Sequence, residues 1–367
     1  MDVQSGSNSA RPPKVCVLSG GPSLEARASR VSAAAVHATL EAAGYEILWL
    51  DLDEAGVWRD CSSGATLSGG QSDLGSLASS PMRSLALLLR RAAAEVVFPA
   101  IHGPYGEDGQ IQELCQSLSI PCVGCDASAS VLCYEKTLFK RVVASAGLPV
   151  ASSLTIDGAQ GDVDPHSFAD AVEQRLGYPC IVKPSKSGSS IGLARAGGPE
   201  ELESAIECAL AVDELVLVEK LITGRDVEVG VFEGGATVVG TPIELEFEGA
   251  LYDFEAKYTR GDRRYMPPRC SARLIDRLRA AAHSAFHATG CRGMARVDFL
   301  ADLGTESFVV NEINTIPYMP ESSTFTSSIC DKTGQSYSEL IEALVLLARS
   351  SDAARLSVAE PTTYASP

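Results

Sequence analysis

Two apolar segments near the C-terminal end of the chain each carry polar side chains that could hold a metal ion. Arg296 and Asp298 lie two residues apart in the first segment, and Glu312 and Asn314 lie two apart in the second. Side chains on a strand alternate between its two faces, so the members of each pair share one face. A turn near residues 303–304 would make the strands antiparallel neighbours. The spacing therefore predicts that the two carboxylates and the amide meet.

Carboxylate and amide oxygens are hard ligands that suit Mg²⁺ when the ion also contacts phosphate. Arg296 beside Asp298 would face the same anion. The alternative is a surface hairpin with a salt bridge. The apolar flanks count against that alternative, because an inward-facing acid needs a partner to offset its desolvation. We therefore interpret Asp298, Glu312 and Asn314 as a candidate metal site.

A second candidate site is the segment 181–192, in which an apolar strand ends near Lys183 and is followed by serine and glycine residues. Small side chains leave backbone N–H groups open to phosphate oxygens, and the lysine adds a positive charge. The segment is not a Walker A loop, because no Gly-Lys-Ser/Thr run opens a helix. Many Ser/Gly loops are only flexible, so this segment by itself leaves both interpretations open.

The segment 102–109, with the sequence HGPYGEDG, follows a predicted strand, which is where open α/β sheets bind ligands. Glu107 and Asp108 could equally cap the next helix, so structure and function both account for them. Glu25 follows a Gly-Gly-Pro-Ser turn at a helix start. It could stabilise the first turn of that helix, or it could receive a substrate ammonium group.

A polar insert over about 248–269 contains the aromatic run LYDFEAKY at 251–258. Its length and composition are typical of a lid over a site. His283 and His287 lie at i and i+4 on a predicted helix but lack an adjacent Glu and a third ligand. A packed or exposed helix face is therefore favoured over a zinc site.

The composition excludes several classes of protein and of partner. The chain has 367 residues, 45% of them hydrophobic and 21% charged, which predicts two or three packed subdomains. Its formal charge of −17 disfavours binding to nucleic acid or to anionic membranes. No apolar run approaches the roughly 18 residues of a membrane span. The N-terminal residues lack the apolar core of a signal peptide.

The chain contains 11 cysteines, an odd number, scattered through otherwise apolar elements. In a chain of this length without a signal peptide, they are expected to be buried free thiols in a reducing compartment, which predicts a cytoplasmic location. Cys122 and Cys125 have C-x-x-C spacing, but no second pair accompanies them. A loop after a strand is the simpler interpretation, and a redox or zinc role is the alternative.

The spacing of apolar residues predicts an α/β chain that opens with a parallel sheet and continues with antiparallel strands after about residue 228. The predicted strands lie at 15–18, 45–50, 96–101, 180–183, 215–220, 294–300 and 307–313. The predicted helices lie at 24–43, 82–91, 130–146, 166–176, 200–211, 271–289 and 336–349. Residues 52–80 are predicted to form a loop. The predicted division is a disordered tail at 1–13, units at 14–125, 126–219 and 220–350, and a tail at 351–367.

Taken together, these motifs resemble those of the D-alanine–D-alanine ligase family, part of the ATP-grasp superfamily. The resemblance runs from about residue 15 to residue 349, with the motifs in the family's order. The matching pieces are GGxSxE ending at Glu25, HGxxGEDG at 102–109, Lys136 at a helix start, KPSxxGSSxG at 183–192, VEK at 218–220, YDxEAKY at 252–258, RxD at 296–298 and NExNTxP at 311–317.

The resemblance implies an α/β fold of ATP-grasp architecture. The unit at 14–125 would be a parallel α/β substrate-binding domain. The units at 126–219 and 220–350 would be two α+β subdomains that clasp ATP between them, the second one catalytic.

The resemblance also implies roles for individual residues. ATP contacts are implied for Lys136, Lys183, Ser189, Glu219, Lys220, Leu221, Ile222, Asp226 and Lys257. Substrate contacts are implied for Glu25, His102, Glu107, Tyr258, Arg296 and Ser323. Metal ligation is implied for Asp298, Glu312 and Asn314, and catalytic roles for Glu25, Ser189, Tyr258 and Arg296.

The implied reaction is ATP-dependent joining of two D-alanines through an acyl phosphate, for peptidoglycan precursor synthesis. It would use Mg²⁺ or Mn²⁺, as two ions. Positive charge is needed because a carboxylate must approach the γ-phosphate of ATP. Arg296 would stabilise the oxyanion of the second step, and a closed lid would keep water away from the acyl phosphate. The implied partners are ATP and small amino acids, without nucleic acid or membrane, and the family expectation is a homodimer.

Two segments depart from the family pattern. Where the family often has Glu-Arg-Glu-Val-Ser, residues 25–29 here read EARAS. The second departure is the larger one. The usual Asn-Thr-x-Pro-Gly is here NTIPY, so that Tyr318 replaces a glycine, and Glu321 adds an acid near the expected second-substrate pocket. These changes favour, as an alternative, a ligase of small-molecule biosynthesis that uses a different acceptor. A catalytically silent ATP-binding protein is a third reading. The complete set of candidate metal and phosphate ligands counts against it.

Overall fold

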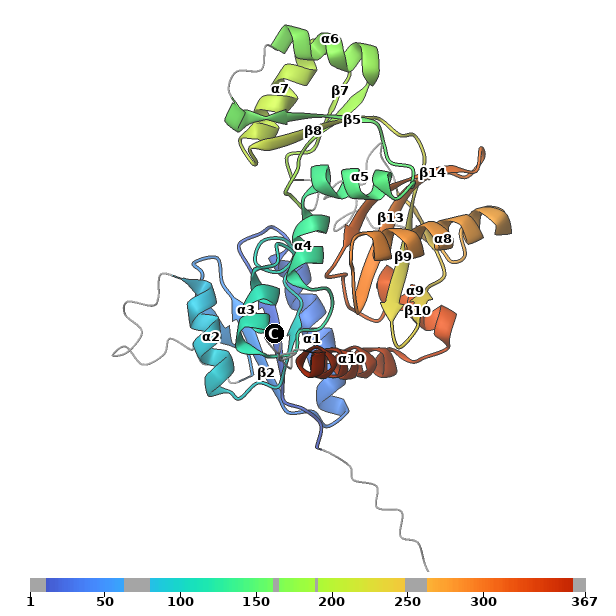
Figure 1. Ribbon diagram of the computed structural model, residues 1–367. Helices are drawn as coiled ribbons and strands as arrows, with labels where there is room; N and C mark the ends of the chain where they lie inside the picture. The colour runs from blue at the N-terminus through green and yellow to red at the C-terminus, as the bar shows by residue number, and fades with distance from the viewer. Residues whose placement is uncertain (1–10, 63–79, 161–164, 189–190, 248–262, 359–367) are drawn as a thin grey trace, which may run out of the picture.

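The computed structural model describes residues 11–62, 80–160, 165–188, 191–247 and 263–358, which form three sheets with helices around them (Figure 1). Within these ranges no helix is long and apolar enough to cross a membrane. All eleven cysteines lie in these ranges, and each is a free thiol, as predicted. The expected burial is wrong for Cys61 and Cys208, which are exposed.

The N-terminal sheet has the strand order β3-β2-β1-β4. β1 (Val15–Gly20) pairs in parallel with β2 (Ile47–Leu52) and with β4 (Val96–Pro99), which confirms the predicted parallel opening. β3 (Trp58–Asp60) pairs antiparallel with β2, inside the stretch predicted to be a loop. The side chain of Trp58 is buried in the apolar cluster below this sheet. Burial of this large ring explains why a strand forms here despite the polar sequence around it.

Helices cover both faces of this sheet. α1 (Ala26–Ala42) packs on one face, and α2 (Pro81–Arg91) and α3 (Gln110–Leu118) contribute to the apolar cluster on the other. α1 ends before Gly44, as predicted, and this glycine has a φ of +82° that favours a residue without a side chain. Glu25 is the residue that precedes α1. The sheet and α1 therefore hold Glu25 at the C-terminal end of β1, the edge where a parallel sheet binds ligands.

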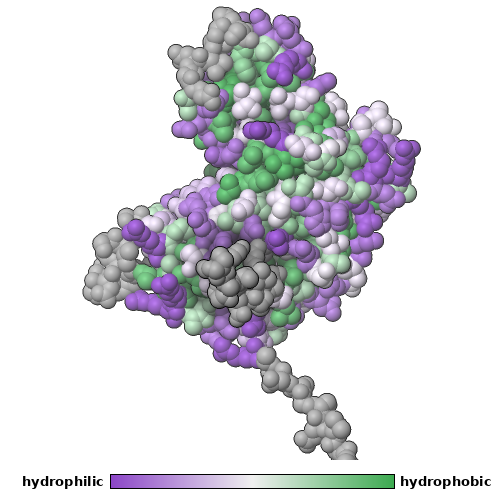
Figure 2. Space-filling model, viewed as in Figure 1, coloured by the Kyte–Doolittle hydropathy of each residue, from purple (hydrophilic) through white to green (hydrophobic). Residues whose placement is uncertain are grey.

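A small antiparallel sheet has the order β5-β8-β6-β7. Its strands are β5 (Ser153–Asp157), β6 (Cys180–Pro184), β7 (Ala194–Ala196) and β8 (Leu215–Lys220). A short 3₁₀ turn, η1 (Gly158–Gln160), follows β5, and the helices of this unit are α6 (Pro165–Arg175) and α7 (Pro199–Leu210). One apolar cluster joins the sheet to both helices. This unit forms the upper lobe in Figure 1, and Figure 2 shows a concave face below it.

The large antiparallel sheet has the order β12-β11-β9-β13-β14, and β10 also pairs with β9. Its strands are β9 (Arg225–Glu233), β10 (Thr237–Val239), β11 (Ile243–Glu246), β12 (Arg263–Tyr265), β13 (Met294–Asp302) and β14 (Ser307–Asn314). α8 (Ala272–Ala288) packs on one face of this sheet. The predicted hairpin of β13 and β14 is confirmed. The face of these strands that is turned away from α8 carries the candidate site residues.

The helix predicted over 130–146 is two helices, α4 (Ala127–Tyr134) and α5 (Lys136–Ser145). Glu135 between them is extended, with ψ of 100°. The break has a tertiary cause. The backbone N–H of Lys136 donates to the carbonyl of Ser185 at 3.1 Å, so this turn bonds to the loop after β6 instead of continuing the helix.

α4 and α5 share an apolar core with the large sheet and α8, although the small sheet follows them in the chain. α9 (Thr324–Thr333) and α10 (Tyr337–Val358) share a core with α1 and the N-terminal sheet. α9 was not predicted. The C-terminal segments thus return to the N-terminal sheet and bring its ligand-binding edge against the large sheet. The division of the chain into units at 14–125, 126–219 and 220–350 stays a prediction.

Candidate active site

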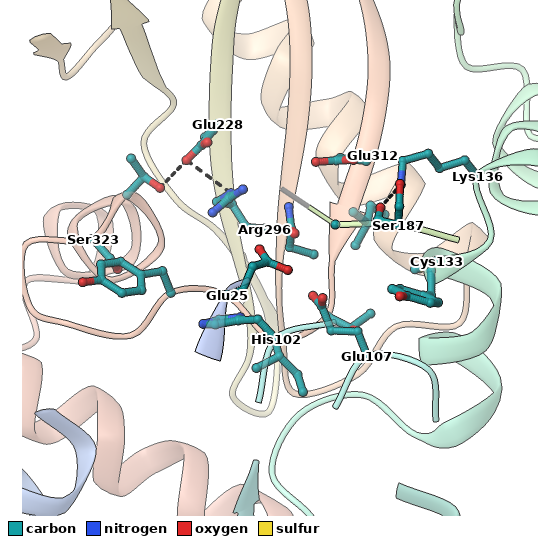
Figure 3. A pocket seen from close by; sticks show the side chains of 18 of the residues that line it. Glu25, His102, Glu107, Cys133, Lys136, Ser187, Glu228, Arg296, Glu312 and Ser323 are labelled. Atoms are coloured by element: carbon teal, nitrogen blue, oxygen red, sulfur yellow. Dashed lines mark hydrogen bonds and ion pairs between the residues drawn. The ribbon is translucent and has the colours of Figure 1, made fainter. Parts of the chain in front are cut away.

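A cavity of about 380 Å³ lies where the N-terminal sheet, α4–α5 and the large sheet meet (Figure 3). The predicted site residues that line it are Glu25, His102, Glu107, Lys136, Arg296, Glu312, Asn314 and Ser323. These side chains come from loops and elements far apart in the sequence. The cavity is thus assembled by tertiary packing and not by any single motif.

The strand register places three carboxylates in a row across the large sheet. Asp298 on β13 pairs with Glu312 on β14, on one side, and with Glu228 on β9, on the other. Arg296 and Asn314 form the adjacent pair of the same hairpin. This register confirms that Asp298, Glu312 and Asn314 meet. Sequence reasoning missed Glu228, because alternation alone did not reveal which strand pairs with β13.

Arg296 lies between two of these acids. Its Nε donates to Asp298 Oδ1 at 2.7 Å and its Nη2 donates to Asp298 Oδ2 at 2.6 Å. The same Nε lies 3.2 Å from Glu228 Oε2. Burial by itself would lower the pKa of this guanidinium, but the carboxylates of Asp298 and Glu228 raise it well above its usual range. Arg296 is therefore a permanent cation that balances a buried acidic row.

Burial raises the pKa of Asp298 to about 7, even with Arg296 beside it, and the charges on Glu228 and Glu312 add to the rise. Asn314 Nδ2 donates to Asp298 Oδ2 at 2.9 Å, which leaves the amide oxygen as an acceptor. Crowded acids that do not all ionise easily are a common arrangement where a cation binds.

The donor set at this row fits a divalent cation. Asp298, Glu312 and Asn314 supply two carboxylates and one amide, all oxygen ligands of the kind that Mg²⁺ prefers. Among the described residues, no group of three or more His, Cys, Asp and Glu side chains is placed to hold a metal ion, so the candidate set here is two carboxylates and one amide. A small protein ligand set with room for phosphate oxygens is typical of magnesium sites that bind nucleotides.

Lys136 faces this row from the start of α5. Its Nζ donates to the carbonyl oxygen of Ser187, in the Ser/Gly loop after β6. Burial lowers the pKa of the Lys136 amine, against the opposing charge of Glu312. The same loop touches the N-terminal domain, because a Cβ at Gly188 would lie 2.5 Å from Glu25 Oε2. A side chain at position 188 would therefore displace the Glu25 carboxylate.

A second buried ion cluster lies behind the Ser/Gly loop, between α5 and the small sheet. Glu219 lies 2.6 Å from Nζ of Lys140 and 2.9 Å from Nζ of Lys183. Burial by itself would raise the pKa of Glu219, but the two lysines hold it below its usual value. Lys183 and Glu219 were predicted and Lys140 was not. Its position one helical turn after Lys136, in an otherwise apolar helix face, was the available signal.

The other predicted ATP contacts lie near this cluster but outside the cavity lining. Lys220 ends β8 with an exposed side chain, Leu221 and Ile222 follow it, and Asp226 lies on β9. Ser189, Lys257 and Tyr258 lie outside the described residues, as does the run 251–258.

The loop after β4 closes the floor of the cavity. Glu107 is buried, and its Oε2 accepts from the backbone N–H of Gly103 at 2.8 Å. Burial raises the pKa of Glu107 to about 8, and the neighbouring charge of Glu25 adds to the rise. Burial also lowers the pKa of His102, whose Nε2 lies 3.4 Å from the hydroxyl of Ser32. Both groups therefore favour their neutral forms near neutral pH.

The remaining wall is the segment before α9. Ser323 is buried and caps α9, because its hydroxyl accepts from the Thr326 backbone N–H at 3.2 Å. The hydroxyl of the next residue, Thr324, donates to Glu228 Oε2. The ring of Tyr318 lies 6.5 Å from that of His102. Thr324 was missed by sequence reasoning, as was Glu228.

Arg264 on β12, within the predicted insert, also contacts this segment. Its Nη1 donates to the Ser322 carbonyl at 2.6 Å, and it lines the cavity.

Two weaker sequence signals lie away from the cavity. The rings of His283 and His287 lie 4.4 Å apart, and Nε2 of His287 lies 3.1 Å from the Thr237 hydroxyl. This contact agrees with a helix face and not with a zinc site. Cys125 donates from Sγ to the carbonyl of Arg292 at 3.4 Å and is not bonded to Cys122.

Comparison with known proteins finds matches over nearly the whole chain. The family model described as D-ala D-ala ligase N-terminus matches residues 14–125, and the one described as D-ala D-ala ligase C-terminus matches residues 142–346. The chain is 35% identical to a D-alanine–D-alanine ligase of Clostridium novyi, over 91% of this chain and 97% of the relative. It is 36% identical to that of Chlorobium luteolum, over 92% and 98%.

Solved structures give the same picture. The D-alanine–D-alanine ligase from Coxiella burnetii has a TM-score of 0.78 at 27% identity, over 95% of this chain and 97% of the other. The VanG D-Ala:D-Ser ligase from Enterococcus faecalis has a TM-score of 0.74 at 28% identity, over 92% and 99%. These likenesses support the ATP-grasp fold expected for the chain.

Proposed function

The chain belongs to the D-alanine–D-alanine ligase family, and from this premise we propose that it joins two D-alanines into D-alanyl-D-alanine while ATP becomes ADP and phosphate. The dipeptide would serve peptidoglycan precursor synthesis. The observation that carries the proposal is the arrangement of charges in one cavity. Arg296, Glu228 and Glu312 line this cavity together with Lys136 and Glu25. Asp298 binds Arg296 but does not itself line the cavity.

Asp298, Glu312 and Asn314 are proposed to hold the divalent metal that the family uses, as Mg²⁺ or Mn²⁺ and as two ions. Bound there, the metal would neutralise negative charge on the phosphates of ATP. Lys136 lines the cavity, and Lys183, which lies 2.9 Å from Glu219 and does not line it, is proposed as a further phosphate contact. Glu219, the segment 220–222 and Asp226 are proposed to contact the nucleoside. Ser189 and Lys257 are proposed as further ATP contacts.

The first step needs the carboxylate of one D-alanine beside the γ-phosphate. Glu25 is proposed to hold the ammonium group of that substrate, because it lines the cavity at the N-terminal sheet. A carboxylate oxygen then forms a bond to the γ-phosphorus, and ADP leaves with the electrons of the broken bond. Ser189 and Tyr258 are proposed to close the site, and Glu107 to line it. Exclusion of water protects the acyl phosphate.

In the second step the amine of the second D-alanine attacks the activated carbonyl carbon. Arg296 is proposed to stabilise the oxyanion that forms, since it is a fixed cation that points into the cavity. His102 and Ser323 are proposed to contact the substrates, Ser323 at the acceptor carboxylate. Phosphate then leaves with the former carboxylate oxygen, and the amine loses a proton.

ATP is the co-substrate, which places the proposed reaction in the cytoplasm, and the free thiols accord with a reducing compartment. A homodimer is proposed from the family resemblance. Tyr318, which replaces the usual glycine, lines the cavity and favours a second candidate function, that of a ligase with a different acceptor. A structural neighbour named as a D-Ala:D-Ser ligase shows that similar proteins differ in this way.

The proposal is tested by incubating the protein with ATP, Mg²⁺ and D-alanine while ADP and the product mass are followed. The expected product is D-alanyl-D-alanine. Glu312→Gln should abolish its formation, and Glu203→Gln, at an exposed position of α7, should not. ADP release only with another acceptor would assign the second candidate. Tight ATP binding without ADP release from any pair of amino acids would indicate a silent ATP-binding protein.

A further inference from the structure

Glu228 is a buried acid in the cavity that neither the proposed metal ligands nor the phosphate contacts use. It lies on β9, on the side of Asp298 away from Glu312. Its side chain is 8% exposed. A carboxylate so buried is costly unless charged or hydrogen-bonding partners offset its desolvation. Its partners therefore indicate what it does.

Those partners are Arg296, the proposed oxyanion-stabilising residue, and Thr324, the first residue of α9. Glu228 Oε2 lies 3.2 Å from Nε of Arg296 and accepts a hydrogen bond from the hydroxyl of Thr324 (Figure 3). One oxygen thus joins the strand that carries Arg296 to the first residue of α9. We propose that Glu228 is a positioning residue for peptide-bond formation, which fixes the Arg296 guanidinium relative to the acceptor-binding start of α9.

A second contact between the same two elements supports this assignment. The hydroxyl of Ser328, one helical turn after Thr324, accepts from the backbone N–H of Gly230 at 3.0 Å. Gly230 lies two residues after Glu228, and a Cβ there would lie 3.0 Å from the carbonyl oxygen of Phe325. α9 therefore packs tightly on β9. Its i and i+4 side chains bond to alternate residues of one strand face.

Arg296 needs a second carboxylate partner because Asp298 has two proposed roles, binding Arg296 and ligating the metal. Asp298 holds Arg296 through both carboxylate oxygens, yet it is also a proposed metal ligand. A guanidinium held from one side only could follow Asp298 when that carboxylate turns. Glu228 is not a proposed metal ligand, so it can hold Arg296 in place while Asp298 ligates the metal. Ser323, next to Thr324, is fixed to the same frame.

The inference rests on the proposed function and predicts a defect in one step. Oxyanion stabilisation belongs to the attack by the amine, whereas phosphoryl transfer to the first carboxylate precedes it. Loss of Glu228 should therefore leave acyl-phosphate formation and slow the attack. The acyl phosphate that is not consumed would then leave the site and hydrolyse in solution, where water adds across the anhydride bond, releasing phosphate and returning D-alanine without a new peptide bond.

The experiment measures phosphate released and dipeptide formed in the same reaction with Mg²⁺, ATP and D-alanine. The wild type should release one phosphate per dipeptide. Glu228→Ala should lower dipeptide formation by about 10- to 100-fold while phosphate release falls much less. Glu228→Gln, which keeps an acceptor oxygen, should lie between them. Thr324→Val should raise the phosphate-to-dipeptide ratio more than Thr324→Ser, which keeps the hydroxyl.

A structural or metal-binding role would give different results. If phosphate and dipeptide fall together in every variant, Glu228 only supports the fold and the inference is overturned. Thermal unfolding without nucleotide, with and without Mg²⁺, gives an independent readout. Loss of the Mg²⁺-dependent shift in Glu228→Gln would make Glu228 a metal ligand and also overturn it.

Two comparisons keep the result interpretable. If Glu228→Ala fails to fold, Glu228→Gln and Thr324→Val still decide the question through their ratios. Glu203→Gln is the matched control for loss of a carboxylate at an exposed position. A wild type that consumes ATP without making any dipeptide would contradict the proposed function itself, which is distinct from a changed ratio in the variants.

Discussion

Two buried ion clusters flank the cavity, and they are built with opposite signs. Behind the Ser/Gly loop, one acid, Glu219, lies between Lys140 and Lys183. In the large sheet, one cation, Arg296, lies between Asp298 and Glu228. Each cluster pairs a central charge with two opposite charges. The first therefore has an excess of one positive charge, and the second an excess of one negative charge.

The pKa values respond in opposite directions to the two arrangements. The pKa of Glu219 is held below its usual value although the group is buried, because two lysines face it. Burial raises the pKa of Asp298 to about 7, because one guanidinium is shared among neighbouring acids. Equal burial therefore does not fix the charge of a carboxyl group, because the neighbouring charges differ. The proposed phosphate contacts include Lys183 of the basic cluster, and the proposed metal ligands include Asp298 of the acidic cluster.

The largest effect is expected when the central cation of the acidic cluster is removed. Arg296→Met should lower dipeptide formation by about 10²- to 10³-fold or more, since an oxyanion partner is lost. It should also leave Asp298 and Glu228 without their cation, so that Mg²⁺ stabilises the variant more than the wild type. Product assays and thermal unfolding with and without Mg²⁺ measure both effects. Arg273→Met, at an exposed position of α8, is the control. Dipeptide formation at the wild-type rate would show that Arg296 has no part in the reaction.

The opposite experiment removes the central anion of the basic cluster. Glu219→Gln leaves two buried lysines facing a neutral amide and should destabilise the protein by about 3 kcal/mol. It should also raise the KM for ATP by about tenfold, since Lys183 loses the partner that orients it. Denaturant unfolding and initial rates measure these changes, with Glu203→Gln as control. Unchanged stability would mean that the two lysines do not depend on Glu219.

Glu107 is a third buried acid, and its described hydrogen-bond donor is the backbone N–H of Gly103 and not a charged side chain. Its neighbouring charges are Glu25, Glu312 and Lys136, and its pKa is about 8. Between pH 4.5 and 8 the native state holds a proton that the unfolded chain has released, so stability falls as pH rises through this window. Glu107→Gln should remove about 2.5 kcal/mol of that fall between pH 5 and pH 7. Parallel pH profiles of wild type and variant would contradict the raised pKa.

The smallest effect is expected at Tyr318, where the acidic side of the cavity borders the acceptor wall. Tyr318→Gly should enlarge this wall and raise the rate with acceptors larger than D-alanine, relative to D-alanine, by about tenfold. Tyr318→Phe keeps the bulk and should leave that ratio nearly unchanged. Competition between pairs of acceptors, read by product mass, gives the ratio directly. If the phenylalanine variant changes it as much as the glycine variant, the hydroxyl and not the bulk sets the preference.

The acidic cluster was more predictable from sequence than the basic one. A spacing of two residues on each of two strands was enough to bring Asp298, Glu312 and Asn314 together, because strand alternation is a local property. Glu228 required knowledge of which strand pairs with β13, which is a tertiary choice. Lys140 required knowledge that α5 packs beside β8, between segments that are far apart in the chain.

The elements show the same limit. The β13–β14 hairpin and the end of α1 were predicted from alternation and from Gly44. The break at Glu135 was not, because its cause is a hydrogen bond to Ser185, fifty residues away in a loop. α9 was missed, although Ser323 at its start is a good N-cap residue. Local chemistry predicted single elements, and the contacts between elements required the structure.

The most direct test of the proposed acyl-phosphate intermediate uses D-alanine with both carboxylate oxygens labelled with ¹⁸O. If a carboxylate oxygen attacks the γ-phosphorus, the phosphate that leaves carries that oxygen away. The expected result is one labelled oxygen in phosphate for each D-alanyl-D-alanine formed, as read by mass spectrometry of the phosphate. Dipeptide formation accompanied by unlabelled phosphate would contradict the acyl-phosphate route.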